Sequence, residues 1–390
     1  MKKTALIALI AVLAASTPLI AQNAADDAYI KAMTETDIAA KVKMLKDWLN
    51  QYGSGHQYEN FANATICTAQ YTGKTPADTI KYGEKALSLG GLDDSSKAQV
   101  LVMVASASLA QNPSKARNHA GQLIQVATAA KGQKAQAGQA QAWNQLIGAG
   151  HYIQAQAYQK ENNNKNALDA YIKSYNILKT KQIATELAKL GKALYDGRDY
   201  ASAERAFKIA VPILNDFGSV TLYAKTLHRE GKKAEAVRYY KQSYSKRKTG
   251  EVAYNIGLLQ APQAQSDANT ANETIQYLLD ASFLSQANSE KAMKMAEGLY
   301  FHHNPEYNQK VQQLIAKNKN LEQMTNTFNN KFGDKEEDDL SDAEKTEMKN
   351  LLASIERGQE EIKQLQAEQE AALNKFTMLV EQAKQRLGVK

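Results

Sequence analysis

The residues of this chain that could do covalent or metal chemistry are few, and they do not form an active-site pattern. The stretch "TGKT" (72–75) looks like the end of a phosphate-binding loop, but Thr68 stands where that loop needs its first glycine, and helix capping by Thr75 explains the stretch better. His302 and His303 are adjacent, so they cannot share a helix face as two metal ligands one turn apart do. The remaining histidines are scattered: His56, His119, His151 and His228. We therefore expect a protein that is not an enzyme, with no catalytic residues, no metal site and no cofactor.

Apolar residues at helical spacing dominate the chain instead, and the stretch 187–210 shows the pattern most clearly. Its first series is Leu187, Leu190, Gly191 and Leu194, and its second is Ala203, Ala206, Phe207 and Ala210. Each series follows the i, i+3, i+4, i+7 rule of one helix face, and Gly197 and Asp199 between them predict a turn. The stretch therefore predicts a helical hairpin, in which the small residues mark the place where the two helices cross closely.

The same pattern of small and bulky residues returns along the chain. Strong copies are Ala155, Ala167, Tyr171, Ser174 and Ala224, Ala236, Tyr240, Ser243; weaker ones are Cys67, Thr79, Gly83, Ala86 and Gly257, Thr274, Leu278, Ala281. A poor copy lies around Ala116, where Val104 or Ala105 would be the first small residue. From Ala116 to Ala167 is too long for one repeat and too short for two, which predicts longer helices in the Ala/Gln-rich stretch between them. A single hairpin cannot bury its own apolar face, so these hairpins must stack.

These residues resemble the tetratricopeptide repeat (TPR), a family of helical hairpins of about 34 residues. The resemblance covers roughly 57–285 and implies an all-α fold, a right-handed TPR-like solenoid. The segment 37–53 is expected to add a solitary second helix, within an N-terminal helical or capping segment over 22–56. Cys67, the only cysteine, is expected to be a buried packing residue.

The C-terminal part, 286–390, is expected to form a hairpin of long helices. Apolar residues near 3,4 spacing predict one helix over 305–332, and heptad positions predict a second over 341–387. An acidic exposed loop (333–341) separates them, and Ser341 with Glu344 forms a capping box at the start of the second. Because the second helix is much longer, its remainder either caps the last repeat or forms a dimerising coiled coil with another chain.

The N-terminus predicts export. "MKK" precedes an uncharged apolar run of signal-peptide length, and cleavage after Ser16 or Ala21 would remove a segment of up to residues 1–21. No cysteine is near the cleavage region, so no lipid anchor is expected, and no transmembrane helix remains after processing. We expect a bacterial protein of the periplasm, or a secreted one. For such a protein nucleic-acid binding is not expected, although the formal net charge is +7.

The TPR resemblance also implies where a ligand would bind. In that family the first helices of the hairpins line a groove that holds peptides, and the positions beside the small residues are here Tyr152, Gln156, Lys160, Lys192, Tyr195, Lys225, His228, Arg229 and Tyr254. Lysine, arginine and tyrosine side chains together favour an acidic peptide or a C-terminal carboxylate. The preferred interpretation is a non-enzymatic exported scaffold that binds a protein or peptide in the bacterial envelope. The alternative is a binding module for a cell-wall polymer or small ligand, with tyrosines that stack on sugars.

Overall fold

The computed structural model describes residues 24–70, 72–132 and 137–389, and the predicted signal segment 1–21 lies outside them. The described residues form 17 α-helices, a short 3₁₀ helix and no strand. The chain divides into two compact units that meet between Leu187 and Ala188, inside helix α9, and each is described by itself. The prediction of an all-α fold is confirmed.

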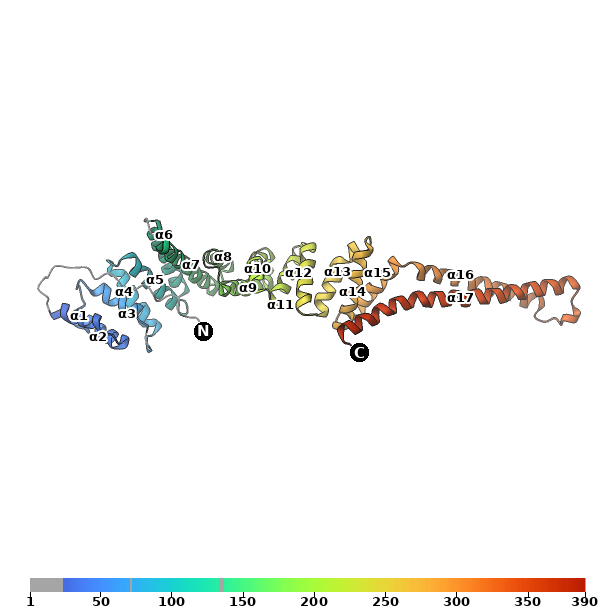
Figure 1. Cartoon of the computed structure of the whole chain (residues 1–390), viewed down its shortest axis with the longest axis horizontal. Helices are drawn as coiled ribbons and strands as arrows, with labels where there is room; N and C mark the ends of the chain where they lie inside the picture. Colours follow the sequence, from blue (N-terminus) through green and yellow to red (C-terminus); the bar gives the residue numbers. More distant parts are fainter. Residues whose placement is uncertain (1–23, 71, 133–136, 390) are drawn as a thin grey trace. The chain divides into compact units, whose positions relative to one another are not determined.

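The helices follow one another with short connections (Figure 1). The first unit contains α1 (Ala24–Thr34), α2 (Ile38–Tyr52), α3 (Glu59–Thr68), α4 (Pro76–Leu89), α5 (Asp94–Ser108), α6 (Pro113–Gly132), α7 (Ala137–Lys160) and α8 (Asn164–Leu178). The second contains most of α9 (Lys181–Asp196), then α10 (Tyr200–Leu214), α11 (Phe217–Arg229), α12 (Lys233–Lys246), α13 (Gly250–Ala264), α14 (Ala268–Leu284), α15 (Ser289–His303), α16 (Glu306–Phe332) and α17 (Asp342–Leu387).

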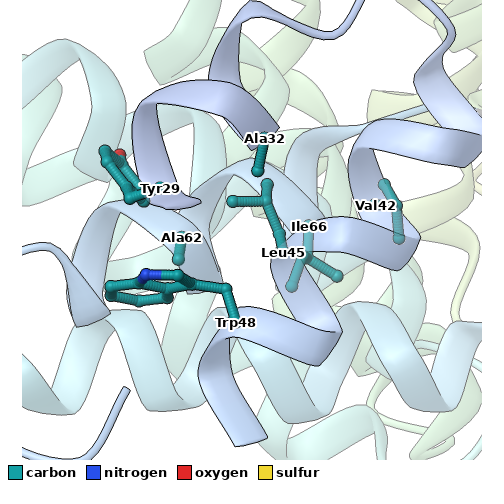
Figure 2. Close-up of a cluster of buried hydrophobic side chains, with 7 residues drawn as sticks. All are labelled: Tyr29, Ala32, Val42, Leu45, Trp48, Ala62 and Ile66. Carbon is teal, nitrogen blue, oxygen red and sulfur yellow. The ribbon is translucent and has the colours of Figure 1, made fainter. Parts of the chain in front are cut away.

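The N-terminal helices form a hairpin, so the prediction of a solitary helix over 37–53 is wrong. Tyr29 of α1 and Trp48 of α2 pack with ring centroids 5.2 Å apart, and the Trp48 indole N–H donates to the Ala25 carbonyl at 2.7 Å. Figure 2 shows the buried cluster that joins α1 and α2 to Ile66 of α3. The apolar face of α2 therefore packs against both α1 and α3. The periodicity of 37–53 did not indicate the contact with α1.

The small residues of the repeats lie where the helices of each hairpin meet, as the spacing predicts. A Cβ atom on Gly191 would lie 3.1 Å from Cζ of Phe207, and one on Gly83 would lie 2.7 Å from Sγ of Cys67. The other predicted crossing residues are also buried, among them Ala155, Ala167, Ala203, Ala210, Ala224, Ala236 and Ala281. Close approach at these positions buries the large neighbours, so Phe207 and Leu190 have no exposed surface. The predicted hairpin repeat is confirmed.

The irregular stretch between Ala116 and Ala167 forms longer helices, which confirms that prediction. α6 has 20 residues and α7 has 24, against 15 in α8 and α10. α5 packs on α6, the second helix of its own hairpin, and on α7, the first helix of the next hairpin. Val104 and Ala105 are both fully buried, so both residues considered for the first small position of this copy belong to the core.

The C-terminal segment forms the predicted hairpin of long helices, α16 and α17, which lie side by side (Figure 1). The predicted capping box is present, because the Ser341 side chain accepts from the Glu344 backbone N–H while the Glu344 carboxylate accepts from the Ser341 backbone N–H at 2.9 Å. The acidic loop contains a 3₁₀ turn, Glu337–Asp339. The end of α17 returns to pack on α14, so this long helix caps the last hairpins of its own chain.

Candidate peptide-binding surface

The predicted binding residues of the second unit come together on α9, α11 and α13. Arg229 at the end of α11 donates to the Tyr195 hydroxyl of α9, and this hydrogen bond raises the pKa of the guanidinium. The Tyr195 ring packs against Tyr200, with centroids 5.4 Å apart. Arg229 is exposed and both tyrosines are half-buried. The arrangement therefore places an exposed cation beside a pair of partly exposed tyrosines.

On α11, Lys225 lies one turn before Arg229, and His228 immediately precedes it. Lys225 Nζ lies 2.6 Å from Glu251 Oε1 of α13, and the His228 ring meets Tyr240 edge to face at 6.3 Å. Burial lowers the pKa of His228, and the charge of Arg229 lowers it further. His228 is therefore a neutral imidazole at neutral pH, a hydrogen-bonding group rather than a third positive charge on α11.

Two of the three predicted cations on this surface have carboxylate partners. Lys192 Nζ lies 2.6 Å from Asp196 Oδ2, one turn along α9, and Lys225 is paired with Glu251. Because Arg229 instead has a neutral partner in Tyr195, the surface is less positive than the lysine and arginine residues alone suggest. Sequence reasoning missed Glu251, although its place in the first turn of α13, just after the cap Thr249, is typical of an acidic residue. Tyr254 lies one turn further along α13 and is half-buried.

The other three predicted residues are on α7, in the first unit. The Tyr152 hydroxyl accepts from Gln182 Nε2 at 3.0 Å, and its ring meets Tyr171 at 5.9 Å. Gln156 is half-buried one turn later, and Lys160 is exposed in the last turn. These three residues therefore lie along one helix of the first unit.

The cysteine and the two adjacent histidines that were considered for chemistry have structural roles in the fold. Cys67 is fully buried, and burial raises the pKa of its thiol to about 12, so the thiolate nucleophile is suppressed. His302 Nε2 lies 3.0 Å from the Gln265 carbonyl oxygen and His303 Nε2 lies 2.6 Å from that of Ala264, so both rings cap the end of α13. Within residues 24–70, 72–132 and 137–389, no three His, Cys, Asp or Glu side chains are grouped to hold a metal ion. No helix in these ranges combines the length and apolar character that a bilayer crossing needs.

Comparison with known proteins finds similarity only at the level of structure. No protein-family model matches the sequence, and no curated protein matches it either. A tetratricopeptide repeat protein from Parabacteroides merdae is similar with a TM-score of 0.34 and 13% identity, covering 70% of this chain and 98% of that one. The TPR2AB domain of yeast Sti1, in a complex with pHSP90, has a TM-score of 0.25 and 16% identity over 58% of this chain and 91% of its own. Yeast Tom70 has a TM-score of 0.26 and 10% identity, and the match covers 74% of this chain and 67% of Tom70.

Proposed function

We propose that this chain is a non-enzymatic scaffold that binds a segment of another protein on the first helices of its hairpins. The observation that carries the proposal is the surface on α9, α11 and α13, where Tyr195, Arg229 and the Lys225–Glu251 pair converge from three consecutive first helices. Side chains that converge from separate rigid helices hold fixed positions, which is what recognition of one chosen segment needs.

The chemistry of the surface favours a polar segment that carries a carboxylate. Arg229 offers guanidinium N–H groups that can bind a carboxylate in a fork, while Lys225 already has Glu251 beside it. A ligand carboxylate would therefore have to compete with Glu251 for Lys225. To bind Arg229 it would displace only the hydrogen bond between Arg229 and the neutral Tyr195 phenol. We place Arg229 at the centre of the site for that reason.

A matched pair of triple variants tests this function. The first replaces Lys192, Lys225 and Arg229 by glutamine; the control replaces three exposed lysines outside this surface, Lys208 of α10, Lys246 at the end of α12 and Lys248 just after it, in the same way. Both lose three positive charges. Quantitative crosslinked co-purification from the native organism should lose its partner in the first variant and keep it in the control. Equal capture by both variants would remove the proposal.

Alanine variants of Tyr195 and Tyr200 test the cell-wall alternative. The paired rings of Tyr195 and Tyr200 are the feature that would stack on a sugar. Sedimentation with purified cell wall that depends on these tyrosines, together with no captured protein, would favour the polymer.

We propose further that the chain is exported, on the signal-peptide pattern of residues 1–21 alone. Cell fractionation and N-terminal sequencing test this: the expected result is a mature chain that begins after Ser16 or Ala21 and is recovered outside the cytoplasm. An intact N-terminus in the cytoplasmic fraction would contradict it.

A further inference from the structure

The last turns of α17 are seated on the side of α14 and α15. The Phe376 ring packs against those of Tyr300 and Phe301, with centroids 5.2 Å and 5.8 Å away, and Ala383 is fully buried. Phe376, Ala383 and Arg386 are seven and then three residues apart, so they share one face of the helix. The final turns of α17 therefore contact this surface as an amphipathic helix lies in a groove.

A buried carboxylate lies at the centre of the contact. Asp280 of α14 is 4% exposed; it accepts a hydrogen bond from the Tyr244 hydroxyl at 2.6 Å and one from Arg386 Nη2 at 2.5 Å. Burial and the Asp280 carboxylate raise the pKa of Tyr244 above its ordinary range, so this hydroxyl remains a donor. Beside it, Lys384 Nζ lies 5.8 Å from the centre of the Phe283 ring. Without Arg386 the carboxylate would keep Tyr244 but lose its compensating charge.

This chemistry is suited to selecting a helix more than to sealing a core. The Arg386 side chain is 38% exposed, so the pair itself adds little net stability, whereas loss of the arginine would leave the buried Asp280 carboxylate without a compensating charge. A surface whose only task was to end the stack would not need this pair, because apolar residues in place of both partners are commonly as stable. The α16–α17 hairpin, here called the arm, is joined to the stack mainly at its two ends. α16 packs mostly on α17 and meets α15 through Tyr307, whose ring lies 4.6 Å from that of Phe301, and its N-cap Pro305 provides no side-chain cap.

We propose that the surface formed by Asp280, Phe283, Tyr300 and Phe301 is a helix-docking site, and that the end of α17 occupies it as an internal substitute for a partner helix. The partner it fits is an amphipathic helix with an aromatic residue ten positions before an arginine, the pattern of Phe376 and Arg386. The α17 arm then limits access to the site, because a tethered occupant competes at a high effective concentration. This site is independent of the surface on α9, α11 and α13.

The test uses the full chain and a labelled peptide of residues 370–389 as probe. Wild-type protein should bind the peptide weakly, because its own arm fills the site. Arg386→Glu should release the arm and increase the affinity for the peptide at least tenfold. Adding Asp280→Asn, which removes the carboxylate charge and keeps a partner for Tyr244, should cancel that gain. Fluorescence anisotropy measures the binding.

Arg357→Glu is the matched control, because it makes the same charge change on α17 while Arg357 bonds only within its own helix, to Ala353 and Ser354. It should bind the peptide as the wild type does. Hydrogen exchange should accelerate over 376–387 in the Arg386 variant and not in this control. The proposal is overturned if the Arg386 variant gains no affinity, if its 376–387 segment keeps wild-type protection, or if sedimentation shows that it instead exchanges arms with a second copy.

Discussion

Two helical glycines, Gly257 of α13 and Gly298 of α15, differ in what surrounds them. A Cβ on Gly257 would lie 2.4 Å from Cδ2 and 2.6 Å from Cγ of the buried Leu278, whereas nothing lies within 4 Å of a Cβ on Gly298. Gly257→Ala should therefore lower the free energy of unfolding by about 1–3 kcal/mol through overpacking. Gly298→Ala should raise it by about 0.5–1 kcal/mol, because alanine is the better helix former. Urea unfolding followed by circular dichroism measures both.

The opposite signs make this pair informative. If both alanine variants were stabilised, Gly257 would be a neutral helix residue and the crossing would tolerate a larger side chain. The position of such crossings could be predicted from sequence because they depend on local spacing: Gly257 and Leu278 belong to one hairpin, and so do Gly191 and Phe207.

The ends of α8 and α10 contain a second kind of special position. Lys179 and Asn215 are C-cap residues in the left-handed conformation, with φ of 48° and 45°. A lysine side chain is strained there, while asparagine tolerates that region better. Lys179→Gly should therefore stabilise the protein by about 0.5–1 kcal/mol, and Asn215→Gly by less. Thermal unfolding compares the two, and an equal or larger gain at Asn215 would contradict this account of the strain.

The start of α17 offers a prediction about protonation. Hydrogen bonds from the Ser341 side chain and backbone, with Lys335 nearby, lower the pKa of Glu344 from 4.5 to about 2. Because the folded pKa is below the unfolded one, the contribution of this capping box is complete above pH 4.5 and is lost as the pH falls toward 2. Carbon NMR titration of the Glu344 carboxyl should show the low value. Ser341→Ala should move it back toward 4.5, and an unchanged titration in that variant would show that another group holds the carboxylate.

How well the sequence predicted an element depended on how local its signal is. The capping box at Ser341 and the cap at Thr75, whose side chain accepts from the Asp78 backbone N–H at 3.0 Å, use residues three apart. Both were therefore visible in the sequence. The helix α1 was not, because its 11 residues bury only Tyr29 and Ala32, too few to show a period. Pro212 lies in the last turn of α10, two residues before the helix ends at Leu214.

Contacts between distant parts of the chain were beyond sequence reasoning. Glu251 neutralises Lys225 from the next hairpin, and Arg386 reaches Asp280 across 106 positions. A repeat pattern shows which residues face a neighbouring helix, but it does not state which charge stands opposite. For that reason the nine binding residues chosen from the sequence predicted which helices carry the surface, but they did not predict the net charge of that surface.

The stacked hairpins and the long C-terminal hairpin should unfold as separate units. The α16–α17 pair buries few apolar side chains, chiefly Leu314, Phe332 and Ile362, and exposes Ile315 and Met378. Repeats that contact only their neighbours lose stability locally. Ile362→Ala should therefore remove about 2–5 kcal/mol of protection from α16 and the middle of α17, without changing amide exchange in α13 and α14. Native-state hydrogen exchange measures each helix separately.

Ile256→Ala is the reciprocal variant, because Ile256 is a fully buried isoleucine of α13. It should accelerate exchange in α13 and α14 and leave the distal part of the α16–α17 pair unchanged. Each variant then serves as the control for the other, since both remove the same atoms from the same residue type. If either variant accelerated exchange in both regions equally, the docked end of α17 would join them into one cooperative unit. In that case the arm could open only when α14 unfolds, and a helix could not enter the Asp280 surface of a folded chain.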